Sequence, residues 1–186
     1  MEYSVFMIVT LAILLALGYI SYMIYLIFFY SKGKAGEKAV ARRLKQLPEE
    51  EYKVINDLML PTTYGTTQID HVVISRFGVF VIETKNYRGF IYGGENAEKW
   101  TQNIWGNKYS MLNPIRQNNT HVKALCDNVE EDLKKEGIAP KRIEGYSEGR
   151  WILMDYSEVI VHIFHPEERE TYNLEDLWEN VSKMLE

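Results

Sequence analysis

The chain has 186 residues, a net charge of −5 and a single cysteine, and 46% of its residues are hydrophobic. One cysteine, Cys126, excludes a disulfide-stabilised secreted domain and fits a reducing compartment, where it is expected to be a small buried apolar residue. The charge is uneven, because residues through Asn119 carry +3 and residues from Thr120 onward carry −8. This shift indicates two segments of different origin, and the acidic total predicts weak, salt-sensitive binding to nucleic acid.

Residues 5–30 form an uncharged apolar run. A helix of that length rises about 39 Å, enough to cross a hydrocarbon core of about 30 Å. A cleaved signal peptide is the alternative, but it requires a basic start, and the only charge before the run is Glu2. We therefore expect residues 1–30 to be a single-pass anchor in the cell membrane. The positive-inside rule places the rest of the chain in the cytoplasm, because five basic residues follow the run: Lys32, Lys34, Lys38, Arg42 and Arg43.

The remaining residues predict an α/β (α+β) domain with a mixed sheet. Glu37 lies in the first turn of an expected helix, and a polar excursion at 87–111 separates the strands from a second helix. That second helix is expected to begin at Asn113 and Pro114 and to end at Gly137. After the membrane helix, the expected order is α-β-β-β-α-β-β-α, over residues 36–48, 52–60, 66–75, 78–85, 113–137, 151–156, 159–164 and 174–184.

The third and fourth of these segments predict an antiparallel hairpin that carries charge. Glu83 and Lys85 share one face of their strand, because successive side chains of a strand point to opposite faces. On the neighbouring strand, Asp70 shares a face with Val72 and Ile74. An exposed ion pair is the plainest explanation of a Glu-x-Lys triplet.

This arrangement of helix, hairpin and helix resembles the core of PD-(D/E)XK nucleases. The motifs "AGEKAV", "TTQIDHVVIS", "GVFVIETKNYRGFI" and "NPIRQN..H" resemble the nuclease-related domain (NERD) family over residues 33–125. Members of that family commonly carry an N-terminal membrane helix. The resemblance implies a nuclease acting on DNA or RNA, with Asp70, Glu83 and Lys85 as the catalytic triplet and Glu37 as a supporting carboxylate.

The chemistry of phosphodiester cleavage suits these residue types. Mg²⁺ neutralises charge on the phosphate and lowers the pKa of an attacking water, and it needs only one or two protein carboxylates. Asp70 and Glu83 would supply those carboxylates as metal ligands. The ammonium of Lys85 would stabilise the developing oxyanion or orient the water. We expect both neutral variants, Asp70→Asn and Glu83→Gln, to leave the thermal midpoint unchanged or higher.

From about residue 119 to 178 the sequence resembles a different family, the C-terminal half of ribosomal silencing factors (RsfS, related to Iojap). The motifs are "IEG", "G.W.L.DY", "VIVHIF" and "ER..YNLE.LW". The resemblance implies binding to the large ribosomal subunit and translation repression by blocking subunit association. The positions it marks for partner binding are Trp151, Leu153, Asp155, Tyr156, His162, Arg169, Tyr172, Leu174 and Trp178.

The two resemblances meet near residues 117–125, which suggests a fusion or chimera of a nuclease-like region, 31–118, with a silencing-factor half, 119–186. Each part lacks strands that the other offers, so a single hybrid sheet around a shared helix is expected. Three functions remain open: a membrane-anchored nuclease, a ribosome-associated silencing factor, or an inactive chimera. The nuclease ranks first because its catalytic set is complete, whereas the silencing-factor part lacks its first strands.

Overall fold

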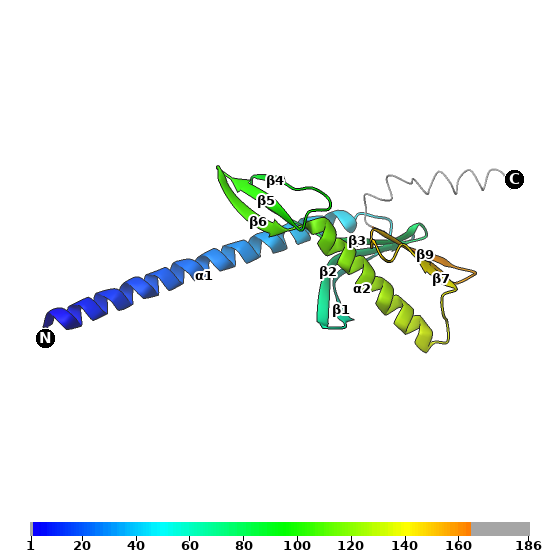
Figure 1. Cartoon of the computed structure of the whole chain (residues 1–186), viewed down its shortest axis with the longest axis horizontal. Helices are drawn as coiled ribbons and strands as arrows, with labels where there is room; N and C mark the ends of the chain where they lie inside the picture. The colour runs from blue at the N-terminus through cyan, green and yellow to red at the C-terminus, as the bar shows by residue number, and fades with distance from the viewer. Residues whose placement is uncertain (1, 165–186) are drawn as a thin grey trace.

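The computed structural model describes residues 2–164 of the chain, from a long N-terminal helix to the last strand of a sheet (Figure 1). Helix α1, Glu2–Leu44, is continuous over 43 residues. The prediction of two separate helices is therefore wrong, and Glu37 lies near the C-terminal end of α1. Single glycines within a helix cost only about 1 kcal/mol each, so Gly33 and Gly36 do not interrupt it. Gly36 also permits close approach, because an added Cβ would lie 2.7 Å from Cβ of Asn86.

The main sheet has six strands in the order β1-β2-β3-β9-β8-β7. All neighbouring strands are antiparallel except β3 and β9, which pair in parallel through Val79↔Ile163 and Phe80↔Phe164. The predicted hairpin and the predicted hybrid sheet are confirmed, and the structure adds β7. The strand bounds are β1 Tyr52–Thr62, β2 Gly65–Ser75, β3 Gly78–Ile82, β7 Arg142–Glu144, β8 Trp151–Asp155 and β9 Ile160–Phe164.

Both faces of this sheet carry apolar side chains, because these alternate along the strands. On one face, helix α2, Pro114–Lys135, packs its buried residues Val122, Leu125 and Cys126 against all the central strands. On the other face, the end of α1 contributes Leu44 to a smaller cluster. Both the front part of the chain, residues 31–118, and the back part, residues 119–186, contribute strand residues to the core. The fully buried apolar strand residues are Ile69, Val72 and Val81 in the front part and Ile152, Met154, Ile163 and Phe164 in the back part.

The ends of α2 follow the sequence prediction. The side chain of Asn113 caps the helix by accepting a hydrogen bond from the backbone N–H of Ile115 at 2.9 Å, and Pro114 follows at the first helical position. Glu136 closes the helix and Gly137 has a φ of 79°, a conformation that favours glycine. The predicted helix at 174–184 lies outside the described residues.

A second sheet of three antiparallel strands occupies the predicted excursion, where no strands were expected. Its strands are short and rich in polar residues, so they lack a strong alternating pattern. Asn113 holds the base of this sheet by donating hydrogen bonds of 2.7 Å to the carbonyl oxygens of Glu95 and Ala97. The sheet lies beside α1 (Figure 1), and its strands are β4 Phe90–Tyr92, β5 Lys99–Ile104 and β6 Asn107–Leu112.

Candidate active site

The structure brings all four predicted catalytic residues to one place. Glu37 comes from α1, Asp70 from β2, and Glu83 and Lys85 from the irregular segment that directly follows β3. Two cavities, of about 450 and 370 Å³, both have Glu37, Asp70 and Glu83 in their walls. The expected strand 78–85 thus ends earlier, at Ile82, but its charged residues still converge with Asp70.

Glu83 is the central side chain of the site. Its Oε1 accepts hydrogen bonds from Nζ of Lys85 at 2.6 Å and from Nε2 of Gln117 at 2.8 Å. Nε2 of His121 lies 3.2 Å from its Oε2. Only 8% of the Glu83 side chain is exposed, against 27% of Lys85. The pair is therefore not the exposed surface ion pair that a Glu-x-Lys triplet commonly forms.

Opposing influences act on the charge of Glu83. Burial, the largest influence, raises the pKa of this carboxyl, but the contacts with His121 and Lys85 together outweigh it and hold the pKa below its ordinary value. Glu83 is consequently a carboxylate at neutral pH. Its Oε2 is buried and receives no hydrogen bond.

Asp70 lies half-buried beside this carboxylate. Burial raises the pKa of Asp70, and the negative charge of Glu83 raises it further. The backbone N–H of Thr84, which donates to Oδ2 at 2.7 Å, opposes this shift but does not cancel it. A cation between Asp70 and Glu83 would relieve the repulsion between the two carboxylates.

The carboxylates of Asp70 and Glu83 suit a hard divalent cation that needs few protein ligands. Within residues 2–164, no group of three or more His, Cys, Asp or Glu side chains is placed to hold a metal ion. Mg²⁺ needs one or two carboxylates, and Oε2 of Glu83 is a buried acceptor without a hydrogen bond. Asp70 and Glu83 thus fit Mg²⁺.

Two residues of α2 complete the site, although the sequence marked them only as family positions or structural side chains. Gln117 and His121 lie one helical turn apart, so both face Glu83. His121 is 5% exposed, and its Nδ1 lies 3.1 Å from Oγ1 of Thr67. The spacing within "NPIRQN..H" is the signal that could have identified them, because it places a polar pair on the buried face of a helix.

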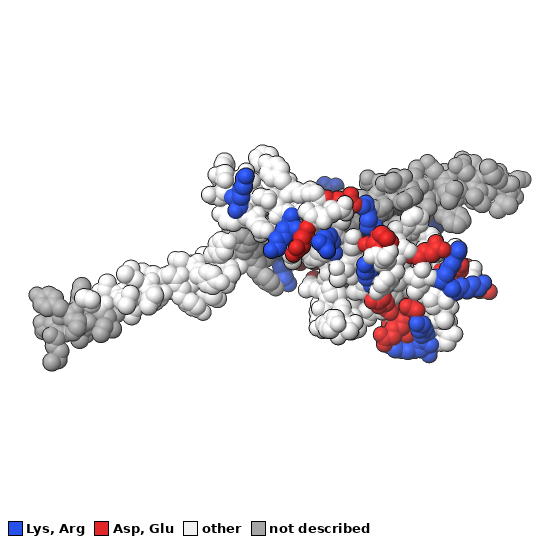
Figure 2. Space-filling view, viewed as in Figure 1, with Lys and Arg blue, Asp and Glu red and all other residues white. Residues whose placement is uncertain are grey.

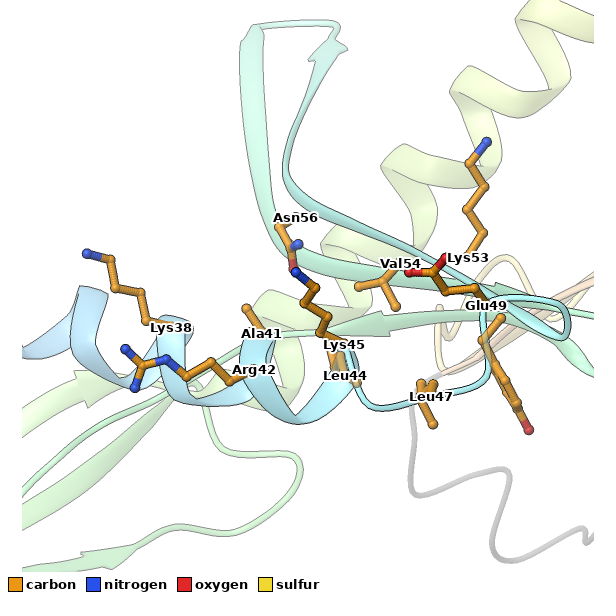
Figure 3. Close-up of a pocket in the computed structure, with 11 residues that line it drawn as sticks. Lys38, Ala41, Arg42, Leu44, Lys45, Leu47, Glu49, Lys53, Val54 and Asn56 are labelled. Carbon is orange, nitrogen blue, oxygen red and sulfur yellow. The ribbon is translucent and has the colours of Figure 1, made fainter.

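A basic groove of about 850 Å³ runs along the C-terminal end of α1, just beyond Glu37. Figure 3 shows Lys38 and Arg42 projecting from the end of α1, and Lys45 follows directly after the helix. Lys53 of β1 adds a fourth cation to its walls. The groove is also lined by Glu49, which reduces its positive charge, and by Leu44, Leu47, Tyr52 and Val54.

Five of the nine predicted partner-binding positions of the back half lie within the described residues, all on or beside β8 and β9. Nε1 of Trp151 donates to Nδ1 of His162 at 3.1 Å, and the Trp151 ring stacks on Phe164 at 5.3 Å between centroids. Asp155 accepts a hydrogen bond from the backbone N–H of Ser157 at 2.9 Å and pairs with Arg142 at 3.2 Å. Leu153 and Tyr156 are partly buried, and the other four positions, Arg169, Tyr172, Leu174 and Trp178, lie outside the described residues.

A mixed sheet between two helices, with carboxylates and a lysine converging at the end of a hairpin, defines an α/β domain of nuclease-related type. The sequence model of the nuclease-related domain matches residues 32–147, more than half of the chain. The chain belongs to the nuclease-related domain family. A second model, that of the ribosomal silencing factor during starvation, matches residues 116–186, so the chain joins the two families.

Individual relatives show the same division. An uncharacterized protein of Bacillus anthracis is 52% identical over 103 residues, which cover 55% of this chain and 49% of that protein. The ribosomal silencing factor of Halalkalibacterium halodurans is 46% identical over 57 residues, 31% of this chain and 49% of that factor. A crystal structure of a Bacillus halodurans protein is 43% identical, covering 32% of this chain and 57% of that one, with a TM-score of 0.30. The chain spans about half the length of the curated relatives.

Proposed function

We propose that this chain is a membrane-anchored, Mg²⁺-dependent nuclease that cleaves phosphodiester bonds of DNA or RNA. One observation carries the proposal: Asp70, Glu83, Lys85 and Glu37 line one cavity, although these four residues come from three separate segments. Residues 31–118 supply this catalytic set, and the back strands complete the sheet that supports it.

Each side chain has a definite task in this proposal. Asp70 and Glu83 would hold Mg²⁺, which when bound neutralises phosphate charge and activates the attacking water. Lys85 lines the cavity and directs a positive charge to the phosphate oxygen on which negative charge develops. Gln117 and His121 fix the orientation of the Glu83 carboxylate, and Glu37 is the supporting carboxylate.

The polyanionic substrate is held by local positive charge in spite of the net charge of −5. Lys32 and Arg88 line the larger cavity, and the basic groove continues along α1 with Lys38, Arg42 and Lys45. Phosphate contacts of this kind supply most of the affinity of proteins for nucleic acids and weaken as salt rises. The acidic charge of the chain belongs mainly to residues from Thr120 onward.

The anchor in this proposal is the apolar part of α1. That helix is long and apolar enough to cross a membrane, its most apolar stretch has a mean hydropathy of 2.2, and none of that stretch is buried in the molecule. The basic residues that follow favour a cytoplasmic domain. A tag at the C-terminus is then protected from protease added outside intact cells, and its digestion from outside would overturn this orientation.

The test of catalysis uses the full chain in detergent micelles with Mg²⁺ and labelled single-stranded DNA, double-stranded DNA or RNA. We expect cleavage by the wild type, and a loss of at least about 100-fold in Asp70→Asn, in Glu83→Gln and on chelation. Asp132→Asn is the matched control, because Asp132 is 77% exposed on α2 and lines neither cavity. Cleavage that survives chelation and both site substitutions would sink the metal mechanism.

A second candidate function is binding to the large ribosomal subunit, which the family match over residues 116–186 supports. Co-sedimentation of the full chain with purified large subunits tests it. The Asp70→Asn variant should bind as well as the wild type, because Asp70 lies in the front part of the chain. Absence of both cleavage and ribosome binding would leave the third alternative, an inactive fusion.

A further inference from the structure

We infer that the small sheet β4–β6 is a second membrane contact, lying in the lipid headgroup layer beside the point where α1 leaves the bilayer. The inference rests on the proposed anchoring by α1. Its first support is exposure, because large apolar and aromatic side chains of this sheet and its turn face solvent. The exposed fractions are 97% for Trp105, 70% for Phe90, 65% for Leu112 and 56% for Tyr92.

The charge of the sheet suits a lipid interface. Its three strands contain two lysines, Lys99 and Lys108, and no acidic residue. Figure 2 shows the outer end of the sheet as a white surface with a blue patch and no red. Trp and Tyr concentrate at the headgroup level of membranes, and lysines there extend to the anionic lipid phosphates. An exposed apolar patch of this kind on a soluble domain usually marks an interaction site, and contact with lipid would account for it here.

The position of the sheet supplies the second, independent support. Tyr25 of α1 lines one cavity of about 580 Å³ together with Ile104, Tyr109 and Met111 of the sheet. Tyr25 belongs to the apolar run and precedes the first lysine, Lys32, by about 10 Å along the helix axis. The sheet therefore reaches down beside the end of the run, and in Figure 1 its β5–β6 turn points along α1 toward the N-terminus.

The lengths agree with this placement. The run of 26 residues rises about 39 Å, roughly 9 Å more than the hydrocarbon core, so its ends extend into the headgroup layers. Tyr25 lies about 7.5 Å before the end of the run, close to the boundary between hydrocarbon and headgroups, so neighbours of Tyr25 on the Lys32 side lie in the headgroup layer. The base of the sheet is held to the domain by Asn113 and by Nε2 of Gln102, which donates to the carbonyl oxygen of Arg88 at 2.8 Å. A sheet fixed at its base and seated in lipid at its tip would stop the domain from rotating about α1.

The test places a fluorescent reporter at the tip of the sheet in the full chain. Cys126 is fully buried, and burial raises the pKa of its thiol to about 12, so an introduced cysteine is labelled selectively. Trp105→Cys carries an environment-sensitive dye in vesicles containing anionic phosphatidylserine. Tyr64→Cys is the matched control, because Tyr64 is also an aromatic residue, 99% exposed, in the turn between β1 and β2.

We expect the dye at position 105 to be quenched at least about twofold more by spin-labelled lipid than the dye at position 64, which aqueous iodide should quench more strongly. Because Trp105 has a φ of 53°, Phe90→Cys on β4 is a second reporter outside the turn, since Phe90 is 70% exposed and pairs with Asn103 beside the tip. Extraction at alkaline pH reports anchoring separately. A chain that stays in the vesicles while positions 105 and 90 behave as position 64 overturns this inference alone. Release of the chain at alkaline pH overturns the anchor and this inference together.

Discussion

The front and back strands of the main sheet use polar residues in opposite ways. At the end of β3, Glu83 and Lys85 face a cavity and share contacts with residues from α1, β2 and α2. On β8 and β9, Trp151 and His162 bond to each other and pack against the core. The front of the chain therefore carries the candidate chemistry, and the back carries packing that the front requires.

The two parts nevertheless share one sheet, because β9 lies directly beside β3. Phe80 and Phe164 stack across this seam with centroids 5.6 Å apart. Val81 on β3 and Ile163 on β9 belong to the same buried cluster. The front strands thus hold the candidate site, and the back strands complete the core beneath it.

The largest effect is expected from a charge placed in the back of that core. Ile163→Asp buries an unpaired carboxylate at a position with 0% exposure, which should cost several kcal/mol and unfold the domain. Ile160→Asp on the same strand is the control, because Ile160 is 45% exposed and its substitution should cost less than about 1 kcal/mol. Ile163→Asp should show neither a cooperative thermal unfolding transition nor cleavage, whereas Ile160→Asp should show both. A folded, active Ile163→Asp protein would show that the back is dispensable.

A milder change in the back should separate stability from catalysis. Trp151→Ala removes a ring that stacks on Phe164 and should lower the free energy of unfolding by about 2 kcal/mol, less than for a fully buried ring. The cleavage rate per folded molecule should stay unchanged. Denaturant unfolding and single-turnover kinetics measure the two effects. A lower cleavage rate per folded molecule in Trp151→Ala would show that the back strands take part in catalysis.

The two carboxylates of the front should differ in their effect on stability. The pKa of Asp70 is raised, chiefly by burial and also by the charge of Glu83. The ionised carboxylate therefore destabilises the folded state, and stability is lost as the pH rises through the raised pKa. Asp70→Asn should therefore raise the thermal midpoint at pH 7, and the gain should vanish below the ordinary Asp pKa.

Glu83→Gln should act in the other direction. Burial raises the pKa of Glu83, but the stronger combined contacts with His121 and Lys85 lower it overall, so the ionised form adds stability that is lost as pH falls through the lowered pKa. The thermal midpoint of Glu83→Gln at pH 7 should be below that of the wild type. This replaces the sequence-based expectation that both variants are neutral or stabilising. Equal thermal midpoints of Glu83→Gln and the wild type across pH 4–8 would contradict the stabilising role of the ionised Glu83 carboxylate.

The smallest effect is expected in the basic groove. Lys45→Gln should weaken binding of single-stranded DNA a few-fold and lower the slope of log affinity against log salt by about 1. The control is Lys134→Gln on α2, where Lys134 pairs with Glu130 at 2.6 Å and lies outside the groove. Binding is measured in the Asp70→Asn background, so that cleavage does not interfere. Identical slopes for the two variants would remove the groove from the substrate path.

Local signals made part of this site predictable. The β2–β3 hairpin follows from two alternating apolar runs joined by a short turn, and this geometry places Asp70 near Glu83. The spacing of Gln117 and His121 marks them as a polar pair on one helix face, but it does not reveal their partner Glu83, which lies 34 or more positions away. The sheet β4–β6 escaped prediction because its strands have three to six residues and few alternating apolar positions.

The place of β9 in the chain has a consequence for biosynthesis. One edge of β3 is filled by a strand that ends about 80 residues later. At about 5–20 residues per second, the ribosome needs roughly 4–16 s to make that interval, during which β3 has an open edge prone to pairing with other chains. Helix α1 emerges long before this gap closes. If α1 is the proposed anchor, a nascent chain would thus reach the membrane before the sheet that supports its candidate site is closed.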